Sequence, residues 1–346
     1  MCGKEYLWRK KWLLVPIMCC LSVLLPGCET DPPPPFPYYS EPRQTCIDLA
    51  TVAVVTSKNY ATEHVVIMVV DGPRYSETWG DPEKELIPHM ANDLAPQGIV
   101  GTAMYNEGVT RTINGHVALA TGCNQDINNS GKDFPARPSL MQIYRKMTGA
   151  PATDTWVVGS KDKIEVLANT SHREWKDQFL PSSWCGTNGG GNGSGYGSDA
   201  ETVVELKKIL TQHHPHLTIV NLMDPDVFGH RNDWPQYING IRTTDDQVWE
   251  IWKHIQTDPE MGGKTTLFVT NDHGRHLDDV ADGFISHGDY CDGCRHINFF
   301  AVGPDFRTDL VTDTRFEQVN ISATAAELLR IPNPANENLV MWELFR

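Results

Sequence analysis

One short stretch, MDPDVFGH at residues 223–230, combines acids and a histidine directly after an apolar run, HLTIVNL. A plain turn would need the proline and the glycine, but neither Asp226 nor His230. Both side chains are costly to bury without a partner. The pair therefore predicts a bound metal ion, provided that other segments supply the remaining ligands.

Acids and histidines recur beside three further apolar runs. These are Asp71 after residues 64–70, Asp272 and His273 after residues 265–271, and His287 ahead of residues 297–303. In open α/β sheets the carboxyl ends of the strands border the site. One such Asp-Gly pair would indicate only a turn. Four clusters together predict a common site at one edge of a sheet.

The residue types select the metal. Carboxylates and imidazoles without thiolates suit zinc, and less often manganese, iron or calcium. The six candidate ligands exceed the needs of one tetrahedral ion, so they predict two divalent metal ions with room for a substrate.

A nucleophile candidate lies in VTRTINGHVALATG, residues 109–122. Thr112 precedes a helix-like segment, where a hydroxyl meets the helix dipole and free N–H groups. Its commoner role there is a helix cap. The metal ligands favour the nucleophile, because a threonine hydroxyl beside zinc can lose its proton near neutral pH.

The elements that position these residues indicate an α/β fold. Unbroken apolar runs predict buried strands at 64–70, 217–223, 265–271 and 297–303, and helical patterns fall at 139–147, 200–213, 245–256 and 323–331. Their alternation predicts a mostly parallel central sheet flanked by helices. Residues 123–200 are a candidate inserted cap. Within them the glycine-rich residues 184–198 lack a P-loop lysine and predict a flexible surface connection.

The N-terminus has the pattern of a targeting segment. Basic residues and a short apolar run end in Leu-Pro-Gly-Cys at 25–28, which resembles a bacterial lipobox. This predicts a lipoprotein signal peptide at 1–27 and a lipid anchor on Cys28. A proline-rich tether would follow at 28–45, before a catalytic domain at 46–346. The expected location is the cell envelope, at the outer membrane or in the periplasm.

Charge and cysteine content narrow the partners. The formal charge of −15 becomes −18 without residues 1–27, which carry four basic residues and one acid. Such a surface repels nucleic acid, so no nucleic-acid partner is expected, and an anionic substrate needs local positive charge. Cys291 and Cys294 form a CDGC motif without a second CxxC motif. A local disulfide or free thiols are therefore favoured over half of a zinc site.

Together these motifs resemble the alkaline phosphatase superfamily, especially its nucleotide pyrophosphatase/phosphodiesterase and phosphate-irrepressible alkaline phosphatase branches. The matching segments are VVDG, TINGHVALATG, PDVFGH, NDHG, SHG before FFAVGPDF, and ISATAAELLRIPNP, which span residues 64 to 346 in the family's order. The resemblance implies an alkaline phosphatase-like fold. It also implies that Asp226, His230 and His287 hold one zinc ion, and that Asp71, Thr112, Asp272 and His273 hold the other. His276 and His296 are alternatives to His287.

The segment VVGSKDKIEVLANT resembles the part of the phosphate-irrepressible enzymes that contacts a phosphate monoester. The resemblance implies this role for Lys161 and Lys163, although the family has arginine at the second position; solvated lysines are the alternative. The family's phosphate-binding asparagine would be Asn128, or its neighbour Asn129. Cys123 is followed by NQDI and lacks the sulfatase C-x-P-x-R setting. Neither the serine nucleophile nor the large insertion of the mutase branch is seen.

The resemblance thus implies a two-zinc hydrolase of small phosphate esters that forms a phosphothreonine intermediate. A phosphomonoesterase is expected. The alternatives are a phosphodiesterase or nucleotide pyrophosphatase, an envelope phosphoethanolamine or phosphoglycerol transferase, and a binding protein.

Overall fold

The computed structural model describes residues 58–335 and 337–346. The expected signal peptide, Cys28 and the tether lie outside these residues. Over the part of the chain that is described, no helix combines the length and apolar character needed to cross a bilayer.

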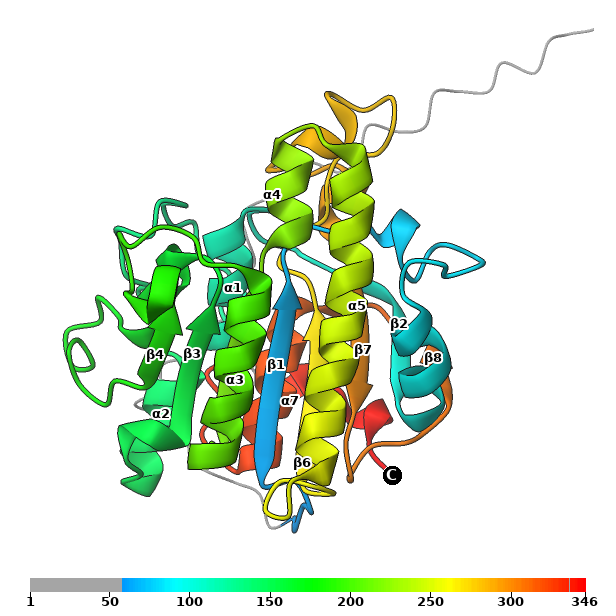
Figure 1. The fold of residues 1–346 in the computed structure, drawn as a ribbon. Coiled ribbons are helices and arrows are strands. Elements are labelled where there is room, and N and C mark those ends of the chain that lie inside the picture. Colours follow the sequence, from blue (N-terminus) through cyan, green and yellow to red (C-terminus); the bar gives the residue numbers. More distant parts are fainter. Residues whose placement is uncertain (1–57, 336) are drawn as a thin grey trace, which may run out of the picture. The chain divides into compact units, whose positions relative to one another are not determined.

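A nine-stranded sheet forms the centre of the fold (Figure 1). The strands are β1 (His64–Val70), β2 (Ile99–Tyr105), β3 (Thr155–Gly159), β4 (Ser182–Cys185), β5 (Leu217–Leu222), β6 (Thr265–Thr270), β7 (His296–Val302), β8 (Leu310–Thr312) and β9 (Phe316–Glu317). Their order is β4-β3-β5-β1-β6-β7-β2-β8, and β9 pairs with β2. All pairings are parallel except those of β7, which runs antiparallel to β6 and to β2. The mostly parallel sheet predicted from the sequence is confirmed.

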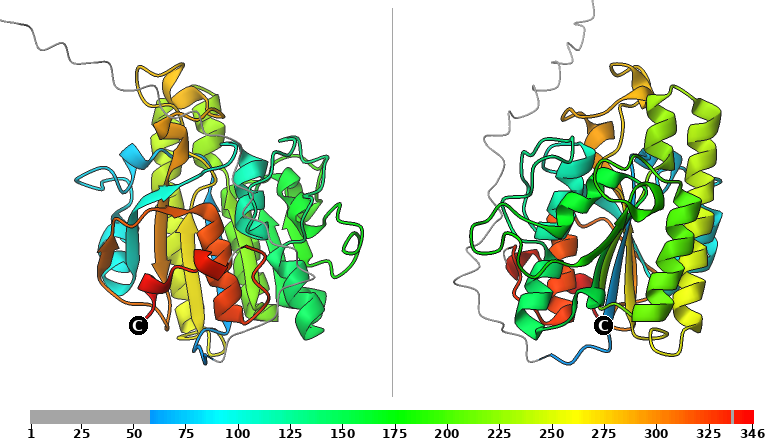
Figure 2. Two further views of the ribbon diagram at one scale, coloured as in Figure 1. Left: turned by 180° about the vertical axis from the view of Figure 1, so that it is seen from behind. Right: turned by 60° about the vertical axis from the view of Figure 1, so that its left-hand side comes forward.

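Helices cover both faces of the sheet, as the two views of Figure 2 show. The helices are α1 (Thr112–Thr121), α2 (Leu140–Thr148), α3 (Asp199–His213), α4 (Asp224–His230), α5 (Trp234–Thr257), α6 (Asp292–Arg295) and α7 (Gln318–Leu329). One face packs against α1, α2 and α7, and the other against α3 and α5. Successive residues of a strand point to opposite faces. Val65 and Ile67 of β1 therefore join the first core cluster, and Val66 and Met68 join the second.

Polar residues define where several helices begin. Ser198 and Glu201 form a capping box at α3, and Ser139 and Gln142 form one at α2. Asp233 accepts a hydrogen bond from the backbone N–H of Gln236, so α5 begins well before the predicted residue 245. These caps satisfy backbone donors that have no partner within the helix.

Residues 123–200 are not a separate cap, and this correction follows from the sheet. They contain β3, which pairs with β5, and β4, which pairs with β3. Both strands are short, so their residues show little hydrophobic periodicity. The glycine-rich segment is also anchored rather than loose. The Asp162 carboxylate accepts hydrogen bonds from the backbone N–H groups of Gly193 and Gly195, and Glu165 accepts one from Asn192.

Candidate active site

The predicted clusters meet at one edge of the sheet. Asp71, Asp226 and Asp272 follow the carboxyl ends of β1, β5 and β6, which are parallel neighbours. His287 precedes β7, and it reaches the same edge because β7 runs in the opposite direction. The four clusters therefore converge at one edge even though β7 is antiparallel to its neighbours.

Three fully buried side chains form the first ligand group: Asp71, Asp272 and His273. The Nε2 atom of His273 lies 3.5 Å from Oδ1 of Asp71 and 3.4 Å from Oδ2 of Asp272. All three atoms lack a hydrogen-bond partner, although buried polar atoms are nearly always paired. The His273 Nδ1 atom donates to the carbonyl of Gly274, which leaves Nε2 as an acceptor. Two carboxylate oxygens and an imidazole nitrogen aimed at one another fit a divalent cation.

Asp226, His230 and His287 form the second ligand group. The Asp226 Oδ1 atom lies 3.4 Å from Nε2 of each histidine, and the two Nε2 atoms are 3.1 Å apart. The Nδ1 atom of His287 donates to the carbonyl of Thr110, so its Nε2 is directed to the site. His273 lies between the two groups, because its ring stacks on that of His287 with centroids 3.6 Å apart.

Burial keeps His273 and His230 neutral, as metal ligation requires. Burial lowers the pKa of His273 to about 3 and that of His230 to about 4. Burial and the nearby charge of Asp272 raise the pKa of Asp71 to about 7. Asp71 and Asp272 thus repel each other, and a divalent ion bound between them would relieve this repulsion.

Lys161 and Arg275 are fully buried cations beside the carboxylates. The Lys161 Nζ atom lies 2.8 Å from Oδ2 of Asp71 and 2.6 Å from Oδ2 of Asp226. Burial alone would lower the pKa of Lys161, but Asp226 and Asp71 raise it above its usual value. Arg275 binds the other Asp226 oxygen and the carbonyls of Phe284 and Ile285. Lys161 thus joins the two ligand groups through oxygens that face away from the histidines.

Thr112 is the first residue of α1 and is buried. The helix lies close to the first ligand group, because a Cβ atom added to Gly115 would be 2.3 Å from the carbonyl oxygen of Asp272. Asn129 accepts a hydrogen bond from the backbone N–H of Ile113 through Oδ1. Asn128, the residue preferred from the sequence, is exposed and accepts from the N–H of Ser130 instead. The structure therefore brings Asn129, and not Asn128, to Thr112.

A cavity of about 310 Å³ opens over these residues. It is lined by Thr112, Asn129, Lys161, Lys163, Tyr196, Asp226, Val227, His230, Arg231 and His287. The Lys163 Nζ atom donates to the carbonyl and to Oδ1 of Asn129, and burial and Lys161 lower its pKa to about 8. The cavity thus combines a hydroxyl, ligand groups and cations, which is the chemistry needed to bind a small anion.

The alternatives to His287 have other partners. His296 stacks between Tyr75 and Tyr105, and its Nε2 atom contacts the carbonyl of Thr102. His276 pairs with Asp282 and Asp289. Of these three histidines, the structure brings His287 to Asp226.

Two supporting residues escaped the sequence reasoning. The Asp199 carboxylate accepts hydrogen bonds from Ser160 and from the backbone N–H groups of Met223 and Asp224, so it ties the Lys161 segment to the start of α4. Asn221 donates to Oδ2 of Asp71. Asp199 lies within a helix capping box, so the sequence suggests only a helix start there. Asn221 lies inside a buried strand, β5. The only sequence signal is the amide of Asn221 within an otherwise apolar run.

Solved structures share this fold. Murine ectonucleotide pyrophosphatase/phosphodiesterase 5, in an inactive threonine-to-alanine variant in complex with AMP, matches with 16% identity and a TM-score of 0.59, over 82% of this chain and 100% of that chain. Lipoteichoic acid synthase from Listeria monocytogenes matches with 12% identity and a TM-score of 0.58, over 84% and 80%. Phosphonate monoester hydrolase from Agrobacterium radiobacter matches with 14% identity and a TM-score of 0.54, over 78% and 74%.

The chain has an alkaline phosphatase-like fold, and groups of acids and histidines at one edge of its sheet could hold metal ions. Residues 164–327 match the family model of the metalloenzyme superfamily. That range contains Asp226, His230, Asp272, His273 and His287, and it excludes Asp71 and Thr112. The matched segment, 164 of the 346 residues, is similar to this superfamily, whose name implies bound metal ions.

Proposed function

We propose that the protein is a two-zinc phosphoric ester hydrolase in which Thr112 is the nucleophile and small phosphate monoesters are the substrates. One observation carries the proposal: unpartnered, buried ligand atoms of Asp71, Asp272 and His273 converge beside the helix that begins with Thr112. Buried polar atoms nearly always have a hydrogen-bond partner, so three atoms without one at the same place indicate a missing ligand.

The two ligand groups assign the metals. Asp71, Asp272, His273 and Thr112 would hold one ion, and Asp226, His230 and His287 would hold the other. When bound, the ions supply positive charge that polarises the phosphoryl group and favours loss of the hydroxyl proton. The neutral imidazoles of His230 and His273 are in the state that such binding needs.

The chain's own residues would carry out a two-step displacement. The Thr112 oxygen forms a bond to phosphorus while the bond to the leaving alcohol oxygen breaks, which gives a phosphothreonine. A water molecule then attacks phosphorus, and the Thr112 oxygen leaves and regains its proton. The α1 N-terminus and Lys163 would face the phosphoryl oxygens of a substrate in the cavity. Asn129 fixes the first turn of α1 through Ile113. The reported inactivity of the threonine-to-alanine variant of the murine protein is consistent with this role.

Lysines in the cavity favour a dianionic monoester, because the additional charge is stabilised only where a cation meets it. Of the two lysines that line the cavity, Lys163 forms no ion pair with the described residues, whereas Lys161 is held by Asp71 and Asp226. This engagement of Lys161 is the observation that favours the second candidate, a phosphodiesterase, whose monoanionic substrate needs less positive charge.

A threonine substitution tests the nucleophile. Thr112→Ala is expected to lower kcat on p-nitrophenyl phosphate by on the order of 10⁴-fold, while elemental analysis still finds the metal. Thr121→Ala, at the other end of α1, is the matched control and should retain turnover. Near-normal activity of Thr112→Ala would refute the assignment. Faster turnover of bis(p-nitrophenyl) phosphate than of the monoester by the wild type would select the phosphodiesterase.

We also propose that Cys28 carries the lipid anchor and that the protein acts in the cell envelope. The lipobox-like sequence and the proline-rich segment support this proposal. In a bacterial host, the full chain should then sediment with membranes and Cys28→Ala should not. Equal sedimentation of the two proteins would contradict the anchor.

A transferase, the other alternative to a hydrolase, would move the phosphoryl-containing group to an added alcohol, which product analysis by mass spectrometry would show.

A further inference from the structure

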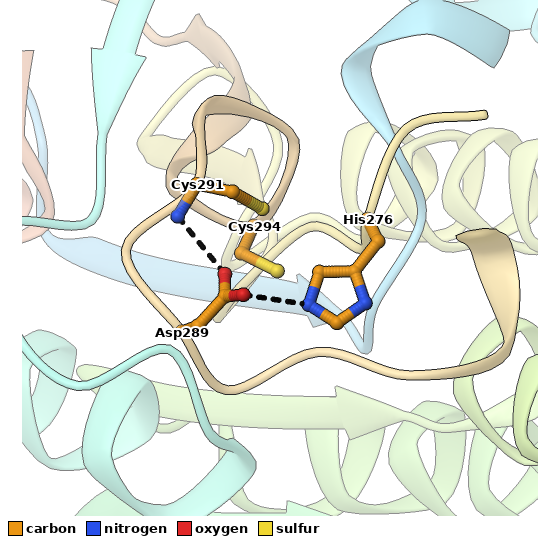
Figure 3. A group of neighbouring side chains, drawn as sticks. All are labelled: His276, Asp289, Cys291 and Cys294. Atoms are coloured by element: carbon orange, nitrogen blue, oxygen red, sulfur yellow. Dashed lines mark hydrogen bonds and ion pairs between the residues drawn. The ribbon is translucent and has the colours of Figure 1, made fainter. Parts of the chain in front are cut away.

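A second cluster of metal-ligand side chains lies outside the cavity, on the long connection between β6 and β7. It consists of His276, Asp289, Cys291 and Cys294 (Figure 3), whose ligand atoms all lie within 4.8 Å of one another. The Nε2 atom of His276 is 3.0 Å from Oδ2 of Asp289. Oδ1 of Asp289 accepts a hydrogen bond from the backbone N–H of Cys291. Both cysteines are free thiols.

The orientation of His276 is the first sign of a built site. Its Nδ1 atom lies 2.9 Å from Oδ1 of Asp282 and 3.3 Å from Oγ of Ser286. Metal-bound histidines commonly donate their other ring N–H to such a carboxylate, which fixes the tautomer. In this arrangement Nε2 is the ligand atom, and it faces Asp289. The ring is 6% exposed, so it is held in this orientation.

The backbone supplies the second sign, because it fixes Cys294 against the segment that carries His276. The backbone N–H of Gly274 donates to the carbonyl of Cys294 over 2.8 Å. A Cβ atom added to Gly274 would lie 2.0 Å from the carbonyl oxygen of Gly293. The two ends of the connection therefore touch, and glycine is required at the contact. Cys294 itself is fully buried.

We propose that this cluster binds a zinc ion through His276, Asp289, Cys291 and Cys294. Four protein ligands close a tetrahedral site, which is the form of structural zinc. The two thiolates distinguish this site chemically from the catalytic groups, whose ligands are carboxylates and imidazoles. Zinc binding converts two thiols to thiolates and releases two protons, and no oxidant is needed. A disulfide between Cys291 and Cys294 is the competing state.

The site would position His287 and not take part in chemistry. The backbone carbonyl of Asp289 accepts a hydrogen bond from the Thr110 hydroxyl over 2.7 Å. The carbonyl of Thr110 in turn accepts from Nδ1 of His287 over 2.8 Å. Thr110 is two residues from Thr112. Fixing Asp289 therefore fixes both His287 and the segment that leads into α1.

Metal analysis of the full chain tests the proposal. The wild type should hold about three ions, and Cys291→Ser/Cys294→Ser about two, if the catalytic groups are filled. Cys185→Ser, which removes a buried free thiol elsewhere, is the matched control and should match the wild type. Asp272→Ala/His273→Ala should keep the ion at the cysteines. A wild type that holds a single ion, which Cys291→Ser/Cys294→Ser loses, would support this site and contradict the catalytic metals.

Cobalt(II) gives a readout that only a thiolate site produces, a near-ultraviolet charge-transfer band. Protein loaded with cobalt alone should show the band in the wild type and in Cys185→Ser, and lose it in Cys291→Ser/Cys294→Ser. Asp289→Asn alters an exposed ligand and should change the band even if the cysteine variant fails to fold. A wild type without the band, or thiols at 291 and 294 that cannot be alkylated without reductant and are therefore a disulfide, would overturn the proposal.

Discussion

Gly115 offers the sharpest test of the geometry at Thr112. In Gly115→Ala, the new methyl group would meet the Asp272 carbonyl oxygen at 2.3 Å, whereas ordinary contacts begin at 3.4 Å. Helix α1 and the Asp272 segment must then separate by about 1 Å, the difference between these distances. A misplacement of about 1 Å can cost on the order of 10²-fold in rate. We expect kcat/KM on p-nitrophenyl phosphate to fall by about that factor.

Two features separate this effect from loss of folding. Alanine is about 1 kcal/mol more favourable than glycine inside a helix, so the substitution does not weaken α1 itself. Gly98→Ala is the matched control. Its methyl group would meet the Ala301 carbonyl oxygen at 2.4 Å, at the opposite edge of the sheet. It should lower the melting temperature and leave kcat/KM of the folded fraction unchanged. A folded Gly115→Ala protein with wild-type kcat/KM and metal content would refute the reasoning.

Three further outcomes are expected. Burial and Lys161 lower the pKa of Lys163 to about 8, so its charge is lost as the pH rises through 8; the KM for a monoester should rise above that pH, and Lys163→Arg should abolish the rise. Lys161→Ala should lower kcat/KM for p-nitrophenyl phosphate more than for its bis-ester; equal losses, with reduced metal content, would assign Lys161 to holding Asp71 and Asp226 alone. Chelation should abolish turnover and lower the melting temperature, since an ion at 100 times its Kd contributes about 2.7 kcal/mol to stability.

The convergence of the candidate metal ligands was predictable because their placement is local. Asp71 and Asp272 each follow a strand whose seven-residue or six-residue run is wholly buried. Such an apolar run predicts both the strand and the residue at which it ends. A polar residue directly after it must lie at the edge of the sheet. The fold class followed from the same runs, alternating with amphipathic helices.

Other features depend on contacts between distant segments, which local patterns do not encode. The direction of β7 is set by its pairing with β6 and β2. The choice of Asn129 over Asn128 depends on which side chain meets the N–H of Ile113. Asp199 reads as an ordinary first-turn helix residue, and only the folded chain shows that it accepts hydrogen bonds from two other segments. Strand β4 has four residues, of which three are only half-buried, so it lacks the apolar run that identified the central strands.

The reversal of β7 has a consequence for how this protein can diversify. A parallel neighbour of β6 would require the chain to cross back along the sheet before re-entering it, usually as a helix. Because β7 is antiparallel, the chain turns back at the same edge at which β6 ends. Residues 271–295 therefore do not have to cross from one edge of the sheet to the other. Insertions there would lengthen the rim of the cavity without changing a single strand pairing, which makes this connection a natural place for substrate range to change.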